Sequence, residues 1–415
     1  MKQAAGHELF IEIGVEEMPS HLIPTALSDF KKNAEKQLAA ASLGHAPLCE
    51  YATPRRLILY TPQLAARQAS RVETVLGPPA KVAFDPKGKP TPAAIGFAKA
   101  NGASLSQLVV TKTEKGDYLS IQKKTASQAT QTLLKTMIPE IIGSLRFVKS
   151  MRWNGPVAFI RPIRWLVALY HGKVVPCTFA QVSSGNLSYG HRLVAPDGFK
   201  VGPFSSYQKE MRKRFVIIDP MERYNTIRKQ IGSVAQKAGG AIEEDATLFW
   251  QAAHSTEYPT AICGSFDPSF LSIPKEIIST AMKEHQGFLP LLKEKNLQPH
   301  FIAVLNNKDK NKKIQKGNER VLRARLSDAK FYFDEDRKVP LQDRLPALKG
   351  VLFQKGLGTL YDKTQRIIAL SRFIAPRVAK LPEKEIEQMA TLCKCDLTAG
   401  VVREFPSLQG IMGRI

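Results

Sequence analysis

The sequence lacks the short motifs with which enzymes commonly hold nucleotides, metals or acyl groups. It has no GxxxxGK[ST] phosphate loop, no GxGxxG between a strand and a helix, no HExxH and no GxSxG. The glycine-rich pairs that do occur have no phosphate-binding pattern. We therefore predict that this chain carries no catalytic residues and no metal site, and that it binds no cofactor of its own.

Long apolar runs are also missing. No stretch of eighteen apolar residues occurs, and the N-terminus MKQAAGHELF has no apolar segment of the kind found in signal peptides. The five cysteines are odd in number and widely scattered, which favours reduced thiols. These observations predict a cytoplasmic protein that neither is secreted nor crosses a membrane. Cys393 and Cys395 have no second cysteine pair, so we interpret them as small buried side chains.

Histidine is absent from the last part of the chain, because all eight histidines lie at or before His300. Helical phosphohydrolases that depend on metal ions need several histidine ligands. The absence therefore argues against that chemistry in the C-terminal region.

Positive charge is abundant. The 415 residues include 60 Lys and Arg against 37 Asp and Glu, which gives a formal net charge of +23 and a pI near 9.8. A charge of this size favours attraction to polyanions, and nucleic acid is the first partner to consider. A solvated basic surface, or an acidic protein partner that balances the charge, is the alternative.

One stretch, residues 317–333, combines this charge with a helix pattern. Its apolar residues follow the i, i+4, i+7, i+11 spacing of one helix face: Leu322, Leu326, Ala329 and Phe333. The candidate contacts with a polyanion lie elsewhere on this helix and in the lysine-rich loop before it: Arg320, Arg323, Arg325, Lys330, Lys312 and Lys313. A solvated charged face, or pairing with the acidic residues 334–336, would explain the same pattern without a ligand.

Three arginines stand beside tryptophans in the middle of the chain. Arg152 precedes Trp153, and Arg161 and Arg164 precede Trp165. Guanidinium groups next to exposed aromatic rings suit RNA, because they can contact phosphates while the rings stack on unpaired bases. The simpler interpretation is that both tryptophans belong to the core. His191, between Gly190 and Arg192, is a weaker candidate that a turn with a hydrogen-bonded histidine would explain equally well.

The spacing of apolar residues predicts a multidomain α+β protein. Strands are expected at residues 9–13, 57–60 and 164–169, and Asp219 followed by Pro220 predicts a helix start. The glycine- and proline-rich residues 77–102 predict a loop or a lightly structured insertion. From residue 317 onward helical periodicity dominates.

Several blocks, spread in order over nearly the whole chain, resemble the beta subunit of the bacterial heterotetrameric glycyl-tRNA synthetase. They are LFIEIGVEEMPS (9–20), ATPRRLILY (52–60), FIRPIRWLVAL (159–169), SGNLSYGHR (184–192), EYPTAICGSFDPSFLSIPKEIISTAMKEHQGFLPL (257–291), GNERVLRARLSDAKFYFDED (317–336), FQKGLGTLYDK (353–363) and CDLTAGVVREFPSLQGIMG (395–413).

The resemblance implies a subunit that binds tRNA-Gly and an alpha subunit in an alpha2beta2 assembly. In that family the alpha subunit carries the active site, so ATP and Mg²⁺ are expected there. It further implies an α/β body over 1–150, a B3/4-like mixed α/β region over 151–315 and an all-α HD-like region over 316–415.

Members of that family continue past the block that ends at residue 413. We therefore expect an incomplete HD-like region, no anticodon-binding domain and a C-terminal truncation. The alternative function is a non-catalytic basic scaffold for RNA or protein, or an inactive fragment.

Overall fold

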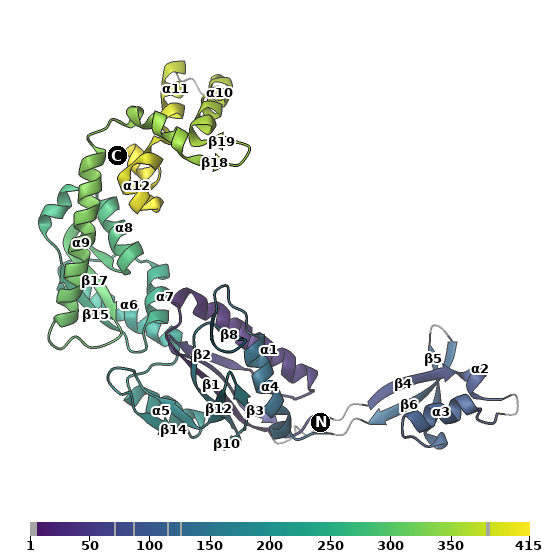
Figure 1. The fold of residues 1–415 in the computed structure, drawn as a ribbon. Coiled ribbons are helices and arrows are strands. Elements are labelled where there is room, and N and C mark those ends of the chain that lie inside the picture. Colours follow the sequence, from purple (N-terminus) through teal and green to yellow (C-terminus); the bar gives the residue numbers. More distant parts are fainter. Residues whose placement is uncertain (1–5, 70–71, 86–87, 114–115, 125–126, 379–381) are drawn as a thin grey trace. The chain divides into compact units, whose positions relative to one another are not determined.

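The computed structural model describes residues 6–69, 72–85, 88–113, 116–124, 127–378 and 382–415. Its contacts group the chain into two compact units. The first unit contains residues 1–18, 22–188 and 198–207, and the second contains residues 19–21, 189–197 and 208–415. Figure 1 shows the elements of both. Strands and helices occur in both units, which confirms the predicted mixed, multidomain class.

The first unit is built on a seven-stranded sheet with the order β11-β12-β9-β1-β3-β2, in which β10 also pairs with β9. The pairs are antiparallel except for β12 with β9. The bounds are β1 Gly6–Val15, β2 Cys49–Thr53, β3 Arg56–Ala65, β9 Ile163–Tyr170, β10 Lys173–Val174, β11 Thr178–Phe179 and β12 Val182–Gly185. Two helices, α1 Ile23–Ala40 and α4 Thr130–Ser144, bury their apolar residues against one face of this sheet.

The central strand β1 sends alternate side chains to the two faces of the sheet. Leu9, Ile11 and Ile13 join the core under α1 and α4. Glu12 lies on the other face, fully buried beside Trp165. Strand β1 continues past the predicted residues 9–13 and includes Gly14. A Cβ atom at Gly14 would stand 1.9 Å from the Trp165 ring, so only glycine fits under the indole.

A small three-stranded antiparallel sheet, β4-β6-β5, occupies residues 72–124. Its elements are β4 Val72–Pro79, α2 Ala80–Ala83, α3 Pro92–Ala100, β5 Leu108–Thr113 and β6 Gly116–Lys124. Leu119 packs with Ala83 and Ala94 in a core of its own. Residues 77–102, predicted as a loop or a lightly structured insertion, are more structured than a loop, because they contain the end of β4, α2 and α3. Strand β4 pairs with β6, which lies about forty residues further along the chain, so it leaves only a weak local pattern.

The remaining short elements of the middle region are β7 Met151–Asn154, β8 Val157–Phe159, β13 Leu187–Tyr189, β14 Gly198–Lys200 and α5 Phe204–Lys213. Strands β7 and β8 form a hairpin, and β13 pairs with β14.

The second unit has a three-stranded antiparallel sheet with the order β15-β17-β16. Its first half contains α6 Pro220–Lys237, α7 Ala246–Ser255, β15 Thr260–Ser265, α8 Lys275–Gln286, β16 Leu289–Lys293 and β17 Asn296–Leu305. Asp219 accepts hydrogen bonds from the backbone nitrogens of Met221 and Glu222, which confirms the predicted start of α6.

The second half of this unit is mainly helical, as predicted. It contains α9 Lys313–Asp336, the 3-10 helix η4 Leu341–Gly350, β18 Leu352–Gln354, β19 Gly358–Thr359, α10 Leu360–Val378, α11 Glu383–Leu392, α12 Gly400–Glu404 and α13 Ile411–Arg414. Cys395 is buried, as predicted, whereas Cys393 is exposed, which contradicts the prediction.

The contacts do not follow the predicted boundaries at 150 and 315. Strand β9, which lies beyond 150, pairs with β1 along seven residues and completes the sheet of the first unit. Helix α9, which crosses 315, packs on α8 in the second unit. Burial of apolar surface, not position along the chain, sets these groupings.

Candidate nucleic-acid interface

Helix α9 begins within the lysine-rich loop. Lys312 has a left-handed backbone with a φ of 54°, and Asp309 accepts hydrogen bonds from the backbone nitrogens of Ile314 (3.3 Å) and Gln315 (2.7 Å). A carboxylate at this position satisfies free N–H groups and complements the positive end of the helix dipole. The predicted basic loop is therefore shorter than expected, because Lys313 and Lys316 already belong to the helix.

The four apolar residues predicted for one face of this helix are all buried: Leu322, Leu326, Ala329 and Phe333. They pack with side chains of α8, β17 and α12 in a single core cluster. This confirms the predicted helix face. The burial fixes the rotation of α9 and turns the opposite side of the helix towards solvent.

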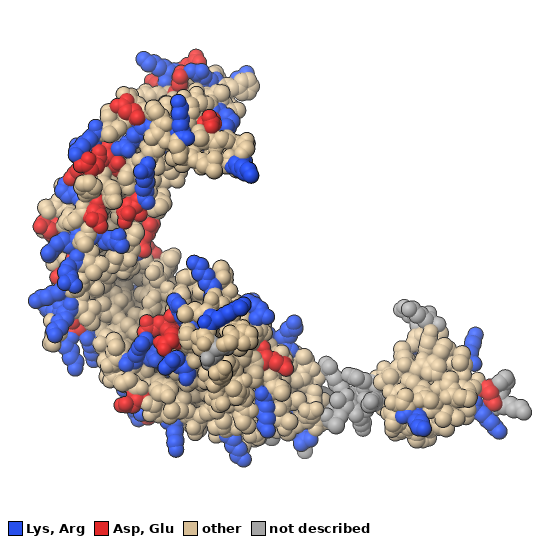
Figure 2. Space-filling view, in the orientation of Figure 1, with Lys and Arg blue, Asp and Glu red and all other residues tan. Residues whose placement is uncertain are grey.

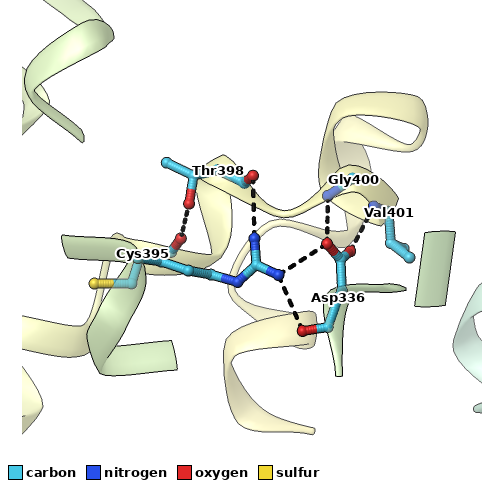
Figure 3. Close-up of polar contacts among 6 residues, drawn as sticks. Asp336, Cys395, Thr398, Gly400 and Val401 are labelled. Atoms are coloured by element: carbon cyan, nitrogen blue, oxygen red, sulfur yellow. Dashed lines mark hydrogen bonds and ion pairs between the residues drawn. The ribbon is translucent and has the colours of Figure 1, made fainter. Parts of the chain in front are cut away.

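Asp336 anchors the C-terminal end of α9 (Figure 3). Its carboxylate oxygens accept hydrogen bonds from the backbone nitrogens of Gly400 (2.8 Å) and Val401 (2.9 Å), at the start of α12. The guanidinium of Arg344 pairs with the same carboxylate at 3.0 Å and also donates to the carbonyl of Thr398. A side chain at Gly400 would meet the Tyr332 ring at 2.9 Å, so the two helices approach too closely for any larger residue.

Charge is divided unevenly along α9. Residues 308–325 carry eight basic and two acidic side chains, whereas residues 326–336 carry one basic and four acidic ones. Figure 2 shows Lys and Arg gathered where α9 begins, with Asp and Glu among them towards its other end. The cationic surface therefore comprises the loop and the first half of the helix only.

Four of the predicted contact residues are exposed on this surface: Lys312, Lys313, Arg320 and Arg323. Within the part of the chain that the structure describes, none of them forms an ion pair. Arg323 is close enough to Asp267 to contribute to a lowered pKa of that carboxyl, although the hydrogen bond from the Ser269 backbone contributes more. These four side chains can reach a phosphate without breaking an internal ion pair.

The other two candidates on α9 are paired internally. Arg325 contacts Glu404 at 3.3 Å, and Lys330 contacts Asp334 at 2.6 Å. The alternative that this helix pairs with the acidic residues 334–336 is thus confirmed for Lys330 and Asp334. Both cations would have to exchange these partners to bind an anion.

The arginine–tryptophan pairs of the first unit serve its own structure. Trp165 is buried, with only 7% of its surface exposed, and its Nε1 donates to Glu12. Trp153 is half-buried and packs against the main core. The interpretation of the tryptophans as core residues is therefore confirmed for Trp165, whereas Trp153 lies partly buried at the edge of the core.

The three arginines next to these tryptophans differ in their surroundings. Arg161 donates to the carbonyl of Glu17 at 3.1 Å, and Arg164 pairs with Glu16 at 3.4 Å. Arg152 is exposed on β7. They can provide charge near RNA, but the structure brings none of them together with an exposed ring of Trp153 or Trp165.

His191 is 1% exposed, and both of its ring nitrogens make internal contacts. The backbone nitrogen of Leu193 donates to Nδ1, so the ring hydrogen lies on Nε2, which donates to the carbonyl of Asn306 at 2.6 Å. This burial takes His191 out of the candidate surface. A hydrogen-bonded histidine in a turn is the interpretation that the structure supports.

A second basic segment lies outside the predicted surface. Residues 341–378 carry seven basic and two acidic side chains, and the imbalance is visible in the sequence itself. Local spacing does not reveal a shared surface there, because these cations are spread among apolar residues over a hairpin and a helix.

The described residues contain no cluster of three or more His, Cys, Asp or Glu that could hold a metal ion. No helix among them is long and apolar enough to cross a membrane.

Comparison with known proteins decides the family. A family model described as glycyl-tRNA synthetase beta subunit matches residues 9–415. The chain belongs to the glycyl-tRNA synthetase beta subunit family.

Curated relatives in this family are similar over almost the whole chain. The glycine–tRNA ligase beta subunits of Syntrophotalea carbinolica and Citrifermentans bemidjiense are each 44% identical to it over 410 residues. The beta subunit of Geobacter sulfurreducens is 42% identical over the same length. In each case the match covers 98% of this chain and 60% of the relative, so the chain spans about three-fifths of the length of these relatives.

Proposed function

We propose that this chain works as a beta subunit of glycine–tRNA ligase, in which it binds tRNA-Gly and supports the ATP-dependent formation of glycyl-tRNA by an alpha subunit. Family membership carries this proposal. The exposed cations of residues 308–325 support it, because they can neutralise phosphates without giving up internal ion pairs. The chain has no nucleotide-binding motif of its own, so ATP and Mg²⁺ would be bound by the alpha subunit.

The role of this chain would be to position the RNA. Phosphate contacts fix the register and orientation of a nucleic acid on a protein surface. A tRNA held in this way, with its 3′ end near the alpha subunit's active site, would react with an effective molarity far above its concentration in solution. Lys312, Lys313, Arg320 and Arg323 are the residues we place at this surface. Arg325, Lys330 and the exposed Arg152 would contribute less.

We also propose, from the family alone, an alpha2beta2 assembly in the cytoplasm. The same source gives the names B3/4-like for the mixed α/β region and HD-like for the helical region. Sedimentation of the chain mixed with an alpha subunit, after nuclease treatment, tests the assembly. Association that disappears with nuclease would mean that RNA, and not a protein interface, joins the two.

The decisive experiment for RNA binding is fluorescence anisotropy with labelled tRNA-Gly over a series of salt concentrations. The double variant Arg320→Gln, Arg323→Gln removes two phosphate contacts. We expect it to reduce the magnitude of the slope of log K against log salt by about 2, since each contact with a duplex contributes about 0.9. An unchanged slope would contradict the proposed surface.

A charge-matched control keeps net charge from explaining the result. Lys32 on α1 and Lys135 on α4 are exposed in the first unit, and neither makes an ion pair with another described residue. The double variant Lys32→Gln, Lys135→Gln removes the same two charges and should leave the salt dependence unchanged. The function itself is tested by glycylation of tRNA-Gly by an alpha subunit with and without this chain, and no stimulation by the chain would count against it.

A further inference from the structure

The segment η4–β18–β19–α10, residues 341–378, has a larger net positive charge than the whole of helix α9. Seven Lys and Arg stand there against Asp343 and Asp362, whereas α9 as a whole carries six basic and five acidic residues. Two of the seven cations hold the structure together, since Arg344 pairs with Asp336 and Arg372 pairs with Glu387. The other five are Lys349, Lys355, Lys363, Arg366 and Arg377. None of these five is in an ion pair with a carboxylate of the described chain.

Helix α10 arranges three of these cations and three apolar residues in one outward stripe. Its inner face is marked by the buried residues Thr364 and Ile368. Away from them, at spacings of three, four and seven residues, lie Lys363, Arg366, Leu370, Phe373, Ile374 and Arg377. From Lys363 to Arg377 the stripe is about 21 Å long, given a rise of about 1.5 Å per residue.

The apolar members of the stripe are exposed to a degree that is unusual for such residues. Phe373 is 61% exposed, Leu370 is 59% exposed and Ile374 is 50% exposed. On the adjoining hairpin Leu352 is 71% exposed. Exposed apolar residues that gather in one place usually mark an interaction site.

Cations lie over the aromatic rings of this segment. The Lys363 ammonium is 3.8 Å from the centroid of the Phe353 ring, and the Arg377 guanidinium carbon is 3.8 Å from that of Phe373. The ammonium of Lys349 is 4.8 Å from the ring of Tyr361. These contacts stabilise the cations without neutralising them, so both the charge and the ring remain available to a ligand.

We propose that this stripe, together with Phe353 of the hairpin, binds unpaired nucleotides of an RNA strand. Bases would stack on the exposed rings while Lys363, Arg366 and Arg377 contact the phosphates between them. A single strand carries aromatic bases between anionic groups, and along α10 the exposed Phe373 ring lies between the cations Arg366 and Arg377. The identity of the RNA as tRNA-Gly rests on the proposed function, but the preference for unpaired nucleotides follows from the stripe alone.

A base-paired RNA could contact the cations of this stripe but could not stack a base on its exposed ring. Duplex RNA presents phosphates and 2′-hydroxyls, whereas its bases are stacked inside and unavailable to Phe373. An acidic, apolar protein segment is the competing occupant. Unpaired RNA and a protein segment differ in how they would use the aromatic ring, because only RNA would stack a base on it. The experiment therefore substitutes Phe373.

The test uses the 415-residue chain with a labelled single-stranded RNA of about 12 nucleotides, within the size range of single-strand sites, and the same sequence as a duplex. Phe373→Ala should weaken single-strand binding about fivefold or more, as expected for the loss of one stacked base, and leave duplex binding unchanged. Phe373→Trp should retain binding. The double variant Arg366→Gln, Arg377→Gln should reduce the salt slope by about 1.4, or about 0.7 for each single-strand contact.

Met389→Ala is the matched control, because Met389 is 54% exposed on α11 and lies outside the stripe. It should leave all RNA affinities unchanged. The proposal is overturned if Phe373→Ala leaves single-strand affinity unchanged, or lowers single-strand and duplex affinity equally. Sedimentation would identify a protein-docking face if Phe373→Ala changed self-association but not RNA binding, which also overturns it. Single-strand binding that depends on Phe373 in a chain that does not stimulate glycylation would support the stripe and contradict the proposed function.

Discussion

Arginine lies against an aromatic ring in two regions of this protein, with opposite consequences. In the sheet of the first unit, the Arg56 guanidinium carbon is 5.6 Å from the centroid of the Trp165 ring, and Arg56 is fully buried. On α10 of the second unit, Arg377 lies 3.8 Å from the Phe373 ring, which is 61% exposed. The residue types are similar, but their surroundings differ.

The buried pair is neutralised within the protein. Arg56 contacts Glu12 at 3.3 Å, and Glu12 also accepts hydrogen bonds from Trp165 and Ser188. Burial raises the pKa of the Glu12 carboxyl, and the Arg56 charge opposes that rise. On α10, by contrast, no carboxylate of the described chain pairs with Arg377. A buried cation must have an internal counterion, whereas an exposed one remains available to an external anion.

Removing the counterion from the buried pair should give the largest effect. Arg56→Met leaves the Glu12 carboxylate buried without its cation, which should lower the free energy of unfolding by about 3 to 5 kcal/mol. Chemical denaturation measures this. Arg164→Met is the control, because Arg164 pairs with Glu16 on the surface of the same sheet and should contribute at most about 1 kcal/mol. Equal losses in the free energy of unfolding for Arg56→Met and Arg164→Met would contradict the distinction between the buried and the exposed ion pair.

A histidine beside a second buried cation should make stability depend on pH. Burial, together with the charge of Arg223, lowers the pKa of His254 from 6.5 to about 4. Between these values the unfolded chain binds the proton more tightly, so stability should fall as the pH is lowered from about 6.5 to 4. The loss should approach about 3 kcal/mol, at about 1.4 kcal/mol per pKa unit.

Denaturation at a series of pH values, with His254→Gln beside the wild type, checks this prediction. The variant should lose that part of the pH dependence. His45→Gln, at an exposed histidine, should retain it. If the His254 variant kept the full dependence, another group would have to be responsible.

The smallest changes in stability are expected for substitutions of the two aromatic residues, Trp165 and Phe373. Trp165→Phe removes the Nε1 donor to buried Glu12 and should lower stability by about 2 kcal/mol. Phe373→Ala, on the exposed stripe, should change stability by less than about 0.5 kcal/mol. Thermal melts of both variants test this. A large loss for Phe373→Ala would show that its ring supports the fold and would weaken its assignment to a ligand.

The regular helices were predictable because their signals are local. The buried face of α9, from Leu322 to Phe333, follows from a spacing of three and four residues. The start of α6 follows from Asp219 and Pro220. Strand β4 of the small sheet was missed because its partner β6 lies about forty residues further along the chain. The full burial of His191 was not predictable, since it depends on Asn306, 115 residues away, whose carbonyl accepts the Nε2 hydrogen bond. The exposure of Cys393 likewise depends on tertiary packing.

The sequence alone thus determines the large positive charge, the positions of the regular helices and the similarity to the family. It does not show which cations are available to a ligand. Arg56 is neutralised by Glu12, 44 residues away, and Arg325 by Glu404, 79 residues away. Arg320 and Arg377 have no such carboxylate among the described residues. Only the tertiary structure separates these cases, because it alone brings distant carboxylates within reach of a cation and decides which of them water can reach.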